Sequence, residues 1–338
     1  MFHRNRSGSV ARNVAPDNSL ASANSAILSS VNSNPLLLRE IQSAMAAQGG
    51  RITFERFMEL ALYHPQYGYY TSHKTRIGRW GDYFTSVSVG PLFGRILARQ
   101  FRAWGVKEVI EFGGHHGQLR SDILAAAPEL RYQLIEVGDP IPDRIRGVVF
   151  SNEFLDALPV HRIVGTQEVY VTEALTEELG PLSDPRLPRL PEGYRAEINL
   201  RALDWLEQVA RRLKHGYILT IDYGFERAEY FAPHHKDGHL QCYHRHTKNA
   251  NPYQHIGEQD ITAHVEFTSL IERGEELGLE TVAFTDQTRF LLEAGMEEIE
   301  NIVHAHAGQY SAERNAIHQL LHSTMGHALK VLVQRKNL

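Results

Sequence analysis

Three short polar clusters each follow an apolar run that has the length of a β-strand. They read "EFGGHHGQL" at 111–119, "SNEFLDALPVH" at 151–161 and "IDYG" at 221–224. Acidic and amide side chains in such positions can bind a ligand, hold a cation or accept a proton. The same residue types also cap helices and close turns, so each cluster has a purely structural interpretation as well.

The first cluster has the glycines of a ligand-binding loop. Gly113 and Gly117 lie between a predicted strand and a predicted helix, where the backbone can approach a ligand closely, although many such turns bind nothing. Glu111 is more informative, because a carboxylate before the first glycine would face the pyrophosphate of a dinucleotide. It suits a cofactor with a cationic amino-acid end, which favours S-adenosylmethionine over NAD or ATP. His115 stands where a glycine is expected.

The other acidic positions each allow two interpretations. Glu136 ends the next strand and could accept both ribose hydroxyls of an adenosine, or be a solvated acid. Asn152 offers a donor and an acceptor, and Glu153 could hold a guanidinium in bidentate fashion. With Asp156, the same two residues could instead begin a helix. Asp222 could act as a base, orient one, or close an Asx-type turn.

The elements that position these clusters alternate between helix and strand. Helical spacing predicts helices at 35–49, 53–64, 90–105, 118–127, 199–216 and 264–278. Apolar runs predict strands at 107–112, 131–137, 147–151, 217–224, 279–285 and 329–335, with 167–175 as an antiparallel addition. This order predicts an α/β fold with a mostly parallel sheet and helices on both faces. Ligands of such sheets bind beyond the carboxyl ends of the strands, where all three clusters fall.

Composition narrows the class of protein. The 338 residues are 42% hydrophobic and 22% charged, which is typical of a globular chain, and the net charge of −5 argues against general nucleic-acid binding. No apolar run approaches the roughly 18 residues of a membrane span. The single cysteine, Cys242, excludes an intrachain disulfide and favours a reducing, cytoplasmic compartment.

The first residues differ from the rest of the chain. Residues 1–34 are rich in Ser and Asn, which predicts a disordered tail. Arginines without early acids allow an organelle transit segment instead, and thus the mitochondrial matrix. After the tail we expect an N-terminal helical segment at 35–105 and a core at 106–338, with an insertion at about 225–263.

Five histidines between His234 and His246 lie near Cys242 and raise the question of a metal. Zinc ligands usually come as two pairs of near neighbours, and the spacing here is irregular. The chain carries 19 histidines scattered throughout, so we expect no metal site.

Several longer stretches resemble the MidA-type family. They read "RITFERFMELALYHPQYGYYTS", "IGRWGDYFTS" with "PLFG", "SNEFLDALPVHR", "LTIDYG", "LQCYHRH", "GEQDITAHVEFTSL" and "QTRFLLEAG", and run from about residue 51 to 293. "MGHALKVLV" extends the resemblance toward residue 333. The resemblance implies a class I, Rossmann-like S-adenosylmethionine-dependent methyltransferase fold with a seven-stranded sheet and an insertion. Mitochondrial members of this family methylate an arginine of a complex I core subunit, so it also implies a protein substrate.

The resemblance assigns site residues by position. The cofactor motifs of the family fall on Glu111, Gly113, His115, Gly117 and Glu136, and its segment near the cofactor falls on Gly81, Asp82 and Thr85. Its N-E-hydrophobic-x-D-A-L-P and D-Y-G motifs fall on Asn152, Glu153, Asp156, Pro159, Asp222, Tyr223 and Gly224.

The chain departs from the family pattern in three places, all around the cofactor. His115 replaces the middle glycine, and Ser88 stands where a Glu is expected. Only 15 residues (137–151) separate Glu136 from Asn152, and a three-turn helix alone needs about 11. One strand–helix unit is therefore expected to be missing or collapsed.

Two functions follow from this pattern. In the first, the protein is an active protein methyltransferase: Glu153 holds an arginine guanidinium, and Asn152 and Asp222 orient the attacking nitrogen. In the second, the chain is a binding or assembly factor with weak or no catalysis. A small-molecule methyltransferase is a third, weaker alternative. The expected partner is a protein resembling a respiratory complex I subunit, and a homodimer is left open.

Overall fold

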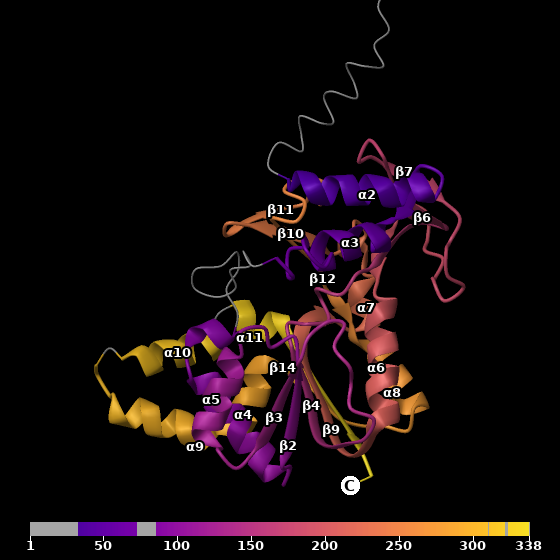
Figure 1. Ribbon diagram of the computed structural model, residues 1–338. Helices are drawn as coiled ribbons and strands as arrows, with labels where there is room; N and C mark the ends of the chain where they lie inside the picture. Colours follow the sequence, from indigo (N-terminus) through magenta and orange to yellow (C-terminus); the bar gives the residue numbers. More distant parts are fainter. Residues whose placement is uncertain (1–32, 73–85, 310, 322–323, 338) are drawn as a thin grey trace, which may run out of the picture.

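The computed structural model describes residues 33–72, 86–309, 311–321 and 324–337 (Figure 1). The predicted cofactor residues Gly81, Asp82 and Thr85 lie outside the described residues, as does the predicted tail up to residue 32.

The lower part of the molecule in Figure 1 is a twisted sheet with the strand order β14-β15-β9-β4-β2-β3. These strands are β2 (Glu108–Phe112), β3 (Arg131–Ile135), β4 (Ile145–Asn152), β9 (Leu213–Phe225), β14 (Glu280–Asp286) and β15 (Leu329–Lys336). A short strand, β13 (Val265–Glu266), also pairs with β9 in parallel. Only β15 runs against its neighbours, so the predicted mostly parallel α/β sheet is confirmed.

Helices cover both faces of this sheet. Successive residues of a strand point to opposite faces, and in β4 Val148 and Phe150 join one core cluster whereas Val149 joins the other. The first cluster packs on α4 (Leu92–Ala103), α5 (Gln118–Ala126), α9 (Gln287–Ala305) and α10 (Ala312–Leu321). The second packs on α6 (Leu200–Arg212) and α8 (Phe267–Glu276).

A second layer, here called the cap layer, lies above the carboxyl ends of the parallel strands (Figure 1). Its helices are α2 (Pro35–Ala47) and α3 (Phe54–Tyr63). One of its sheets contains β1 (Arg51–Thr53), β5 (His161–Val164), β6 (Gln167–Thr172), β7 (Glu177–Gly180) and β8 (Arg195–Ile198), and the other contains β10 (Leu240–His244), β11 (Thr247–Asn249) and β12 (Asp260–Ala263). The predicted antiparallel strand at 167–175 is thus one member of a larger sheet.

The chain passes from β3 to β4 through residues 136–144, which contain neither helix nor strand. β3 is consequently the edge of the sheet, and it carries exposed Arg131 and Gln133, as edge strands often do. This connection, which lacks both helix and strand, agrees with the predicted loss of one strand–helix unit.

Two predicted helices extend into residues that form strands in the structure, so these helix boundaries are wrong. The helix predicted at 199–216 ends at Arg212, because His215 and Gly216 already pair with β4. The helix predicted at 264–278 begins at Phe267, because Val265 and Glu266 pair with β9. Among the described residues, no helix is long and apolar enough to cross a membrane.

Candidate active site

Glu111 lies at the end of β2 with its side chain turned into the protein. It is 3% exposed, and its Oε2 accepts a hydrogen bond of 2.9 Å from the Tyr132 hydroxyl. Burial raises the pKa of Glu111 to about 7, against the lowering effect of that hydrogen bond. A Cβ on Gly114 would lie 2.7 Å from the Glu111 carboxylate, so the loop needs glycine here to pass over the acid.

The rest of the loop turns in left-handed conformations. Gly113, His115 and Gly117 have φ angles of 72°, 48° and 70°. The His115 N–H donates a 2.7 Å hydrogen bond to Oε1 of Glu136, so the acid after β3 is tied to the loop after β2. The backbone therefore accommodates the His115 departure. Burial lowers the pKa of His115 to about 4, which keeps the imidazole neutral near pH 7.

The second cluster is a tight turn built around the carboxylate of Asp222. Asp222 is fully buried, and its Oδ2 accepts hydrogen bonds from the backbone N–H groups of Phe154 (3.1 Å), Leu155 (2.8 Å) and Asp156 (3.4 Å). Its Oδ1 accepts another from the Tyr223 N–H at 2.9 Å. With both oxygens engaged, the geometry favours an orienting role for Asp222 over that of a proton acceptor.

Glu153 begins this turn in a conformation that is uncommon for a residue other than glycine. Its φ is 50°, and its N–H donates to the Ile221 carbonyl at 2.9 Å. Oε1 of Glu153 accepts hydrogen bonds from the Asn152 side-chain amide at 3.1 Å and from the Ser86 N–H at 3.2 Å. Burial and then the nearby Asp222 raise the pKa of Glu153 to about 8, against the lowering effect of the hydrogen bonds from Ser86 and Asn152.

Asn152 leaves one acceptor unused. Its Nδ2 donates to Glu153, whereas its Oδ1 is buried and has no hydrogen-bond partner among the described residues. A buried acceptor without a partner is unfavourable unless a ligand supplies the donor. Asn152 Oδ1 and the Glu153 carboxylate together offer acceptors to a cation that carries N–H groups.

Residues of the cap layer reach the same region. Tyr63, from α3, donates to the Ala157 carbonyl at 3.1 Å, and its pKa is raised by burial and then by Asp260 and Asp156. Tyr70 donates to Asp260 at 2.7 Å, and Asp260 is 1% exposed. "GEQDITAHVEF" contained Asp260, but nothing in its spacing indicated a place near Glu153.

The structure thus brings the predicted residues into two adjoining groups. Glu111, Gly113, His115, Gly117 and Glu136 form one, and Asn152, Glu153, Asp156 and Asp222 form the other. They are in contact, since a Cβ on Gly113 would lie 2.7 Å from the Phe154 ring. The first group offers a buried acid and a glycine-rich turn, and the second concentrates buried carboxyl groups whose ionised forms a bound cation would favour.

The histidine-rich stretch contains one set of side chains that could reach a common ion. Potential ligand atoms of Glu229, His234 and His235 lie within 4.8 Å of one another on the surface of the described part of the chain. Cys242 lies elsewhere, fully buried in the cap-layer core.

Comparison with known proteins identifies related sequences. Residues 136–285 match a family model described as "Putative S-adenosyl-L-methionine-dependent methyltransferase". A stretch of 121 residues, 32% of this chain, is 31% identical to the mitochondrial protein arginine methyltransferase NDUFAF7 of Danio rerio. A stretch of 166 residues, 43% of this chain, is 27% identical to its counterpart in Mus musculus. The matched regions span 27% and 36% of the length of these relatives.

Solved structures match nearly the whole chain. A Burkholderia thailandensis protein crystallised with S-adenosyl-homocysteine superposes with a TM-score of 0.81 at 29% identity, covering 96% of this chain and 95% of that one. A native crystal structure from the same organism gives a TM-score of 0.77 at 28% identity, with the same coverage.

Proposed function

We propose that this chain, which resembles the MidA-type family and matches S-adenosylmethionine-dependent methyltransferases, transfers a methyl group from that cofactor to a protein side chain, with arginine as the favoured acceptor. The observation that carries this proposal is the pair of acceptors formed by Asn152 Oδ1 and the Glu153 carboxylate. A guanidinium could fill both at once.

The loop residues suit the cofactor. Glu111 is a buried acid at the start of the loop and would hold the ammonium of the methionine moiety. Gly113 and Gly117 keep the backbone free of side chains where the cofactor would approach. Glu136 has one carboxylate oxygen bonded to the His115 N–H, which leaves the other for ribose hydroxyls. S-adenosylmethionine would supply an electrophilic methyl group bonded to a sulfonium.

Asn152 and Glu153 would bind the arginine side chain and orient it toward the methyl group. Glu153 and Asn152 would accept N–H bonds from two guanidinium nitrogens and orient the third toward the methyl carbon. That nitrogen would bond to the methyl carbon as the carbon–sulfur bond breaks, and it would then lose a proton. The guanidinium charge would favour the ionised form of Glu153, whose pKa in the ligand-free protein is raised to about 8, chiefly by burial, and the carboxylate would then take up that proton.

Two measurements test the proposal. Calorimetric titration of the full chain with S-adenosyl-homocysteine should give micromolar affinity in wild type and in Glu153→Gln. Incubation with labelled cofactor and arginine-containing protein substrates should label protein in wild type and not in Glu153→Gln. No binding at millimolar ligand would remove the cofactor from the proposal. Labelling that is unchanged in Glu153→Gln would remove the assigned role of Glu153.

The alternative of a binding or assembly factor with little catalysis is favoured by one observation. Nε2 of His115 is buried without a partner among the described residues, inside the loop that should receive the cofactor. If the imidazole fills that space, His115→Gly should bind S-adenosyl-homocysteine at least as well as wild type. A large loss of affinity in His115→Gly would show instead that the imidazole contacts the ligand.

The names of the relatives bear on the compartment proposed for this chain. The relatives are named as mitochondrial, which favours the matrix over the cytoplasm as the compartment of this chain. We propose a subunit resembling those of respiratory complex I as the protein substrate. Comparative proteomics of arginine methylation with and without the gene would identify it, and light scattering of the pure protein would decide between monomer and homodimer.

A further inference from the structure

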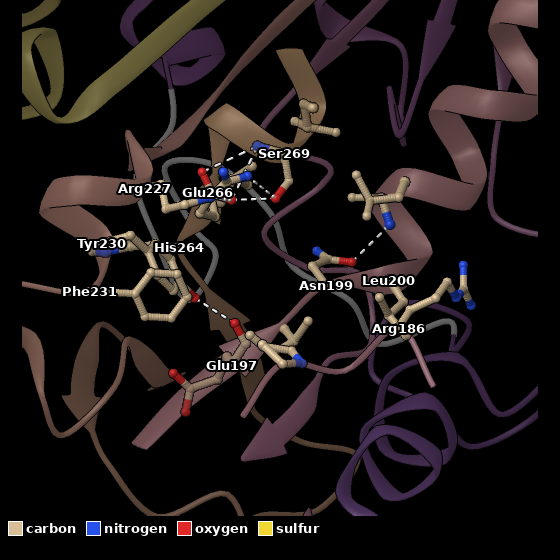
Figure 2. Close-up of a pocket in the computed structure, with 16 residues that line it drawn as sticks. Arg186, Glu197, Asn199, Leu200, Arg227, Tyr230, Phe231, His264, Glu266 and Ser269 are labelled. Atoms are coloured by element: carbon tan, nitrogen blue, oxygen red, sulfur yellow. Dashed lines mark hydrogen bonds and ion pairs between the residues drawn. The ribbon is translucent and has the colours of Figure 1, made fainter. Parts of the chain in front are cut away.

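A cavity of about 320 Å³ lies between α6, α8, the short helix α7 (Arg227–Tyr230) and strand β8 (Figure 2). Tyr230, Phe231 and His264 line one side, and Asn199, Leu200 and Arg186 line the other. Apolar side chains make up most of its wall: Leu200, Leu203, Val265, Leu270 and Phe231. Its volume is at the lower end of the range of about 300 to 1,000 Å³ for ligand sites, which suits a single side chain.

The cavity wall is hydrogen-bonded to the turn that carries Glu153. Asn199 caps α6 by accepting the Ala202 N–H at 2.9 Å, and its Nδ2 donates to the Leu155 carbonyl at 2.7 Å. On the opposite wall, the N–H of Ala263, the residue before His264, donates to the Asp156 carbonyl at 2.9 Å. Hydrogen bonds from Asn199 and Ala263 therefore connect both walls of the cavity to the Glu153 turn.

The rings of His264 and Tyr223 lie between the cavity wall and the acidic group. The plane of the His264 ring is tilted by 22° from that of Tyr223, with centroids 6.4 Å apart, and burial, followed by the charges of Glu153 and Asp156, raises the pKa of Tyr223. Burial lowers the pKa of His264 to about 3, so this wall is neutral. The Nδ1 atom of His264 is buried and has no partner among the described residues.

The charged groups around the cavity are already paired with one another. Arg186 binds Asp184 at 2.9 Å and Asp204 at 2.6 Å. Arg227 binds Glu272 at 2.5 Å. The buried acid of the wall, Glu197, accepts from Arg162 and from the His239 N–H. An ionic ligand would have to displace these partners, whereas an apolar group would not.

We propose that this cavity is a subsite for an apolar side chain of the protein substrate, a few residues from the methylated one. The inference rests on the proposed protein methyl transfer, and it adds a sequence preference to it. An apolar neighbour would bind beside the Glu153 turn while the acceptor side chain lies on Asn152 and Glu153. Two linked groups held at two adjoining sites bind more tightly than either alone.

The test uses the full chain, saturated with S-adenosyl-homocysteine, and seven heptapeptides with blocked ends. Each peptide has arginine at its centre and glycine elsewhere, except at one position. In six peptides that position holds phenylalanine, one to three residues before or after the arginine, and in the seventh it holds alanine. The variant Leu203→Trp fills the cavity, and Leu292→Trp, a matched half-buried leucine on α9, is the control. Calorimetry measures peptide affinity.

We expect at least one phenylalanine peptide to bind wild type and Leu292→Trp about tenfold more tightly than the alanine peptide, which corresponds to about 1.4 kcal/mol. Leu203→Trp should bind the phenylalanine and alanine peptides with equal affinity. Equal affinity of all seven peptides for wild type would overturn the subsite, and so would an unchanged preference in Leu203→Trp.

A second probe, N-acetyl-phenylalanine amide, separates this inference from the proposed function. Its saturable binding to wild type, with a shift of the His264 ring signals that is lost in Leu203→Trp, supports the cavity as a side-chain site. Absence of that shift at saturating probe overturns it. Failure of the proposed function would appear independently, as absent S-adenosyl-homocysteine binding with probe binding intact.

Discussion

At the scale of single residues, the site contains buried acids that have different roles. Asp222 has both carboxylate oxygens engaged with backbone N–H groups and so orders the turn. Glu153 keeps its carboxylate beside the unpaired Asn152 Oδ1 and is the group that can meet an acceptor. Glu111, in the other loop, lies beneath the glycines.

Replacing Asp222 by Asn should destabilise the protein strongly. The amide has one acceptor oxygen, and its NH₂ group would face backbone donors that now bind a carboxylate. Unsatisfied buried donors cost about 1–3 kcal/mol each, so we expect Asp222→Asn to lower the free energy of unfolding in urea by about 3 kcal/mol. The exposed Asp143→Asn should change it little, and equal stability of the two variants would contradict the role of Asp222.

Cofactor affinity should depend on pH through Glu111. Its pKa is raised to about 7 in the ligand-free protein, so the carboxylate needed by the ammonium is increasingly protonated below pH 7. Affinity for S-adenosyl-homocysteine should fall about tenfold from pH 8 to pH 6. Tyr132→Phe removes a donor to the carboxylate and should move the midpoint upward. A pH profile for Glu111→Gln that matches wild type would rule out this assignment.

At the scale of elements, the N-terminus of α6 and the Glu153 turn form one unit through Asn199. Its Oδ1 caps the helix, and its Nδ2 fixes the Leu155 carbonyl. Asp caps helices as well as Asn does, but its carboxylate cannot donate to that carbonyl.

Asn199→Asp should therefore keep the cap and lose the contact with the turn. We expect the free energy of unfolding to fall by about 1–3 kcal/mol, because the buried Leu155 carbonyl loses its donor. Cofactor affinity should change little, and kcat should fall about ten- to a hundredfold because the turn is displaced. Asn199→Ala should lose the cap as well, at about 1 kcal/mol. Wild-type kcat in Asn199→Asp would show that the Leu155 contact is only structural.

The positions of the site residues in the strands explain which of them could be predicted from the sequence. Glu111, Glu136, Glu153 and Asp222 could be predicted to lie close together, because each is at or near the carboxyl end of a parallel strand and these ends meet at the same edge of the sheet. Asp260 was not predictable, because it comes from a cap-layer strand whose placement depends on long-range packing. The strands of the cap sheet have three to six residues, too short for a reliable period.

At the scale of the whole molecule, the core and the cap layer meet over a cluster of buried acids. The pKa values of Glu111, Glu153 and Asp222 are raised to about 7, 8 and 7, chiefly by burial. The pKa values of His115 and His264 are lowered, so these rings are neutral in the folded state at pH 6.5. In the unfolded chain they have the ordinary pKa of about 6.5 and are largely neutral by about pH 7.5. Above about pH 7.5, the acids of this cluster therefore determine how its contribution to the free energy of unfolding changes with pH.

The ligand-free protein should become less stable as pH rises from 7.5 to 8.5. An acid with a raised pKa in the folded state binds more protons there than in the unfolded chain, so its stabilising effect is present at low pH and is lost as pH rises through the folded pKa. Glu153→Gln should raise Tm at pH 8.5 and flatten the decline. Scanning calorimetry across this range checks it, and a Tm that rises with pH in wild type would contradict it.

The position of β15 has a consequence for how the chain folds during synthesis. This strand, Leu329–Lys336, lies between β14 and β9 and supplies the partner of β9 along eight residue pairs. Until residue 336 has emerged from the ribosome, one edge of β9 remains unpaired and β14 has no place in the sheet. The folding nascent chain thus exposes an apolar strand edge, the kind of surface that chaperones bind and aggregates grow from.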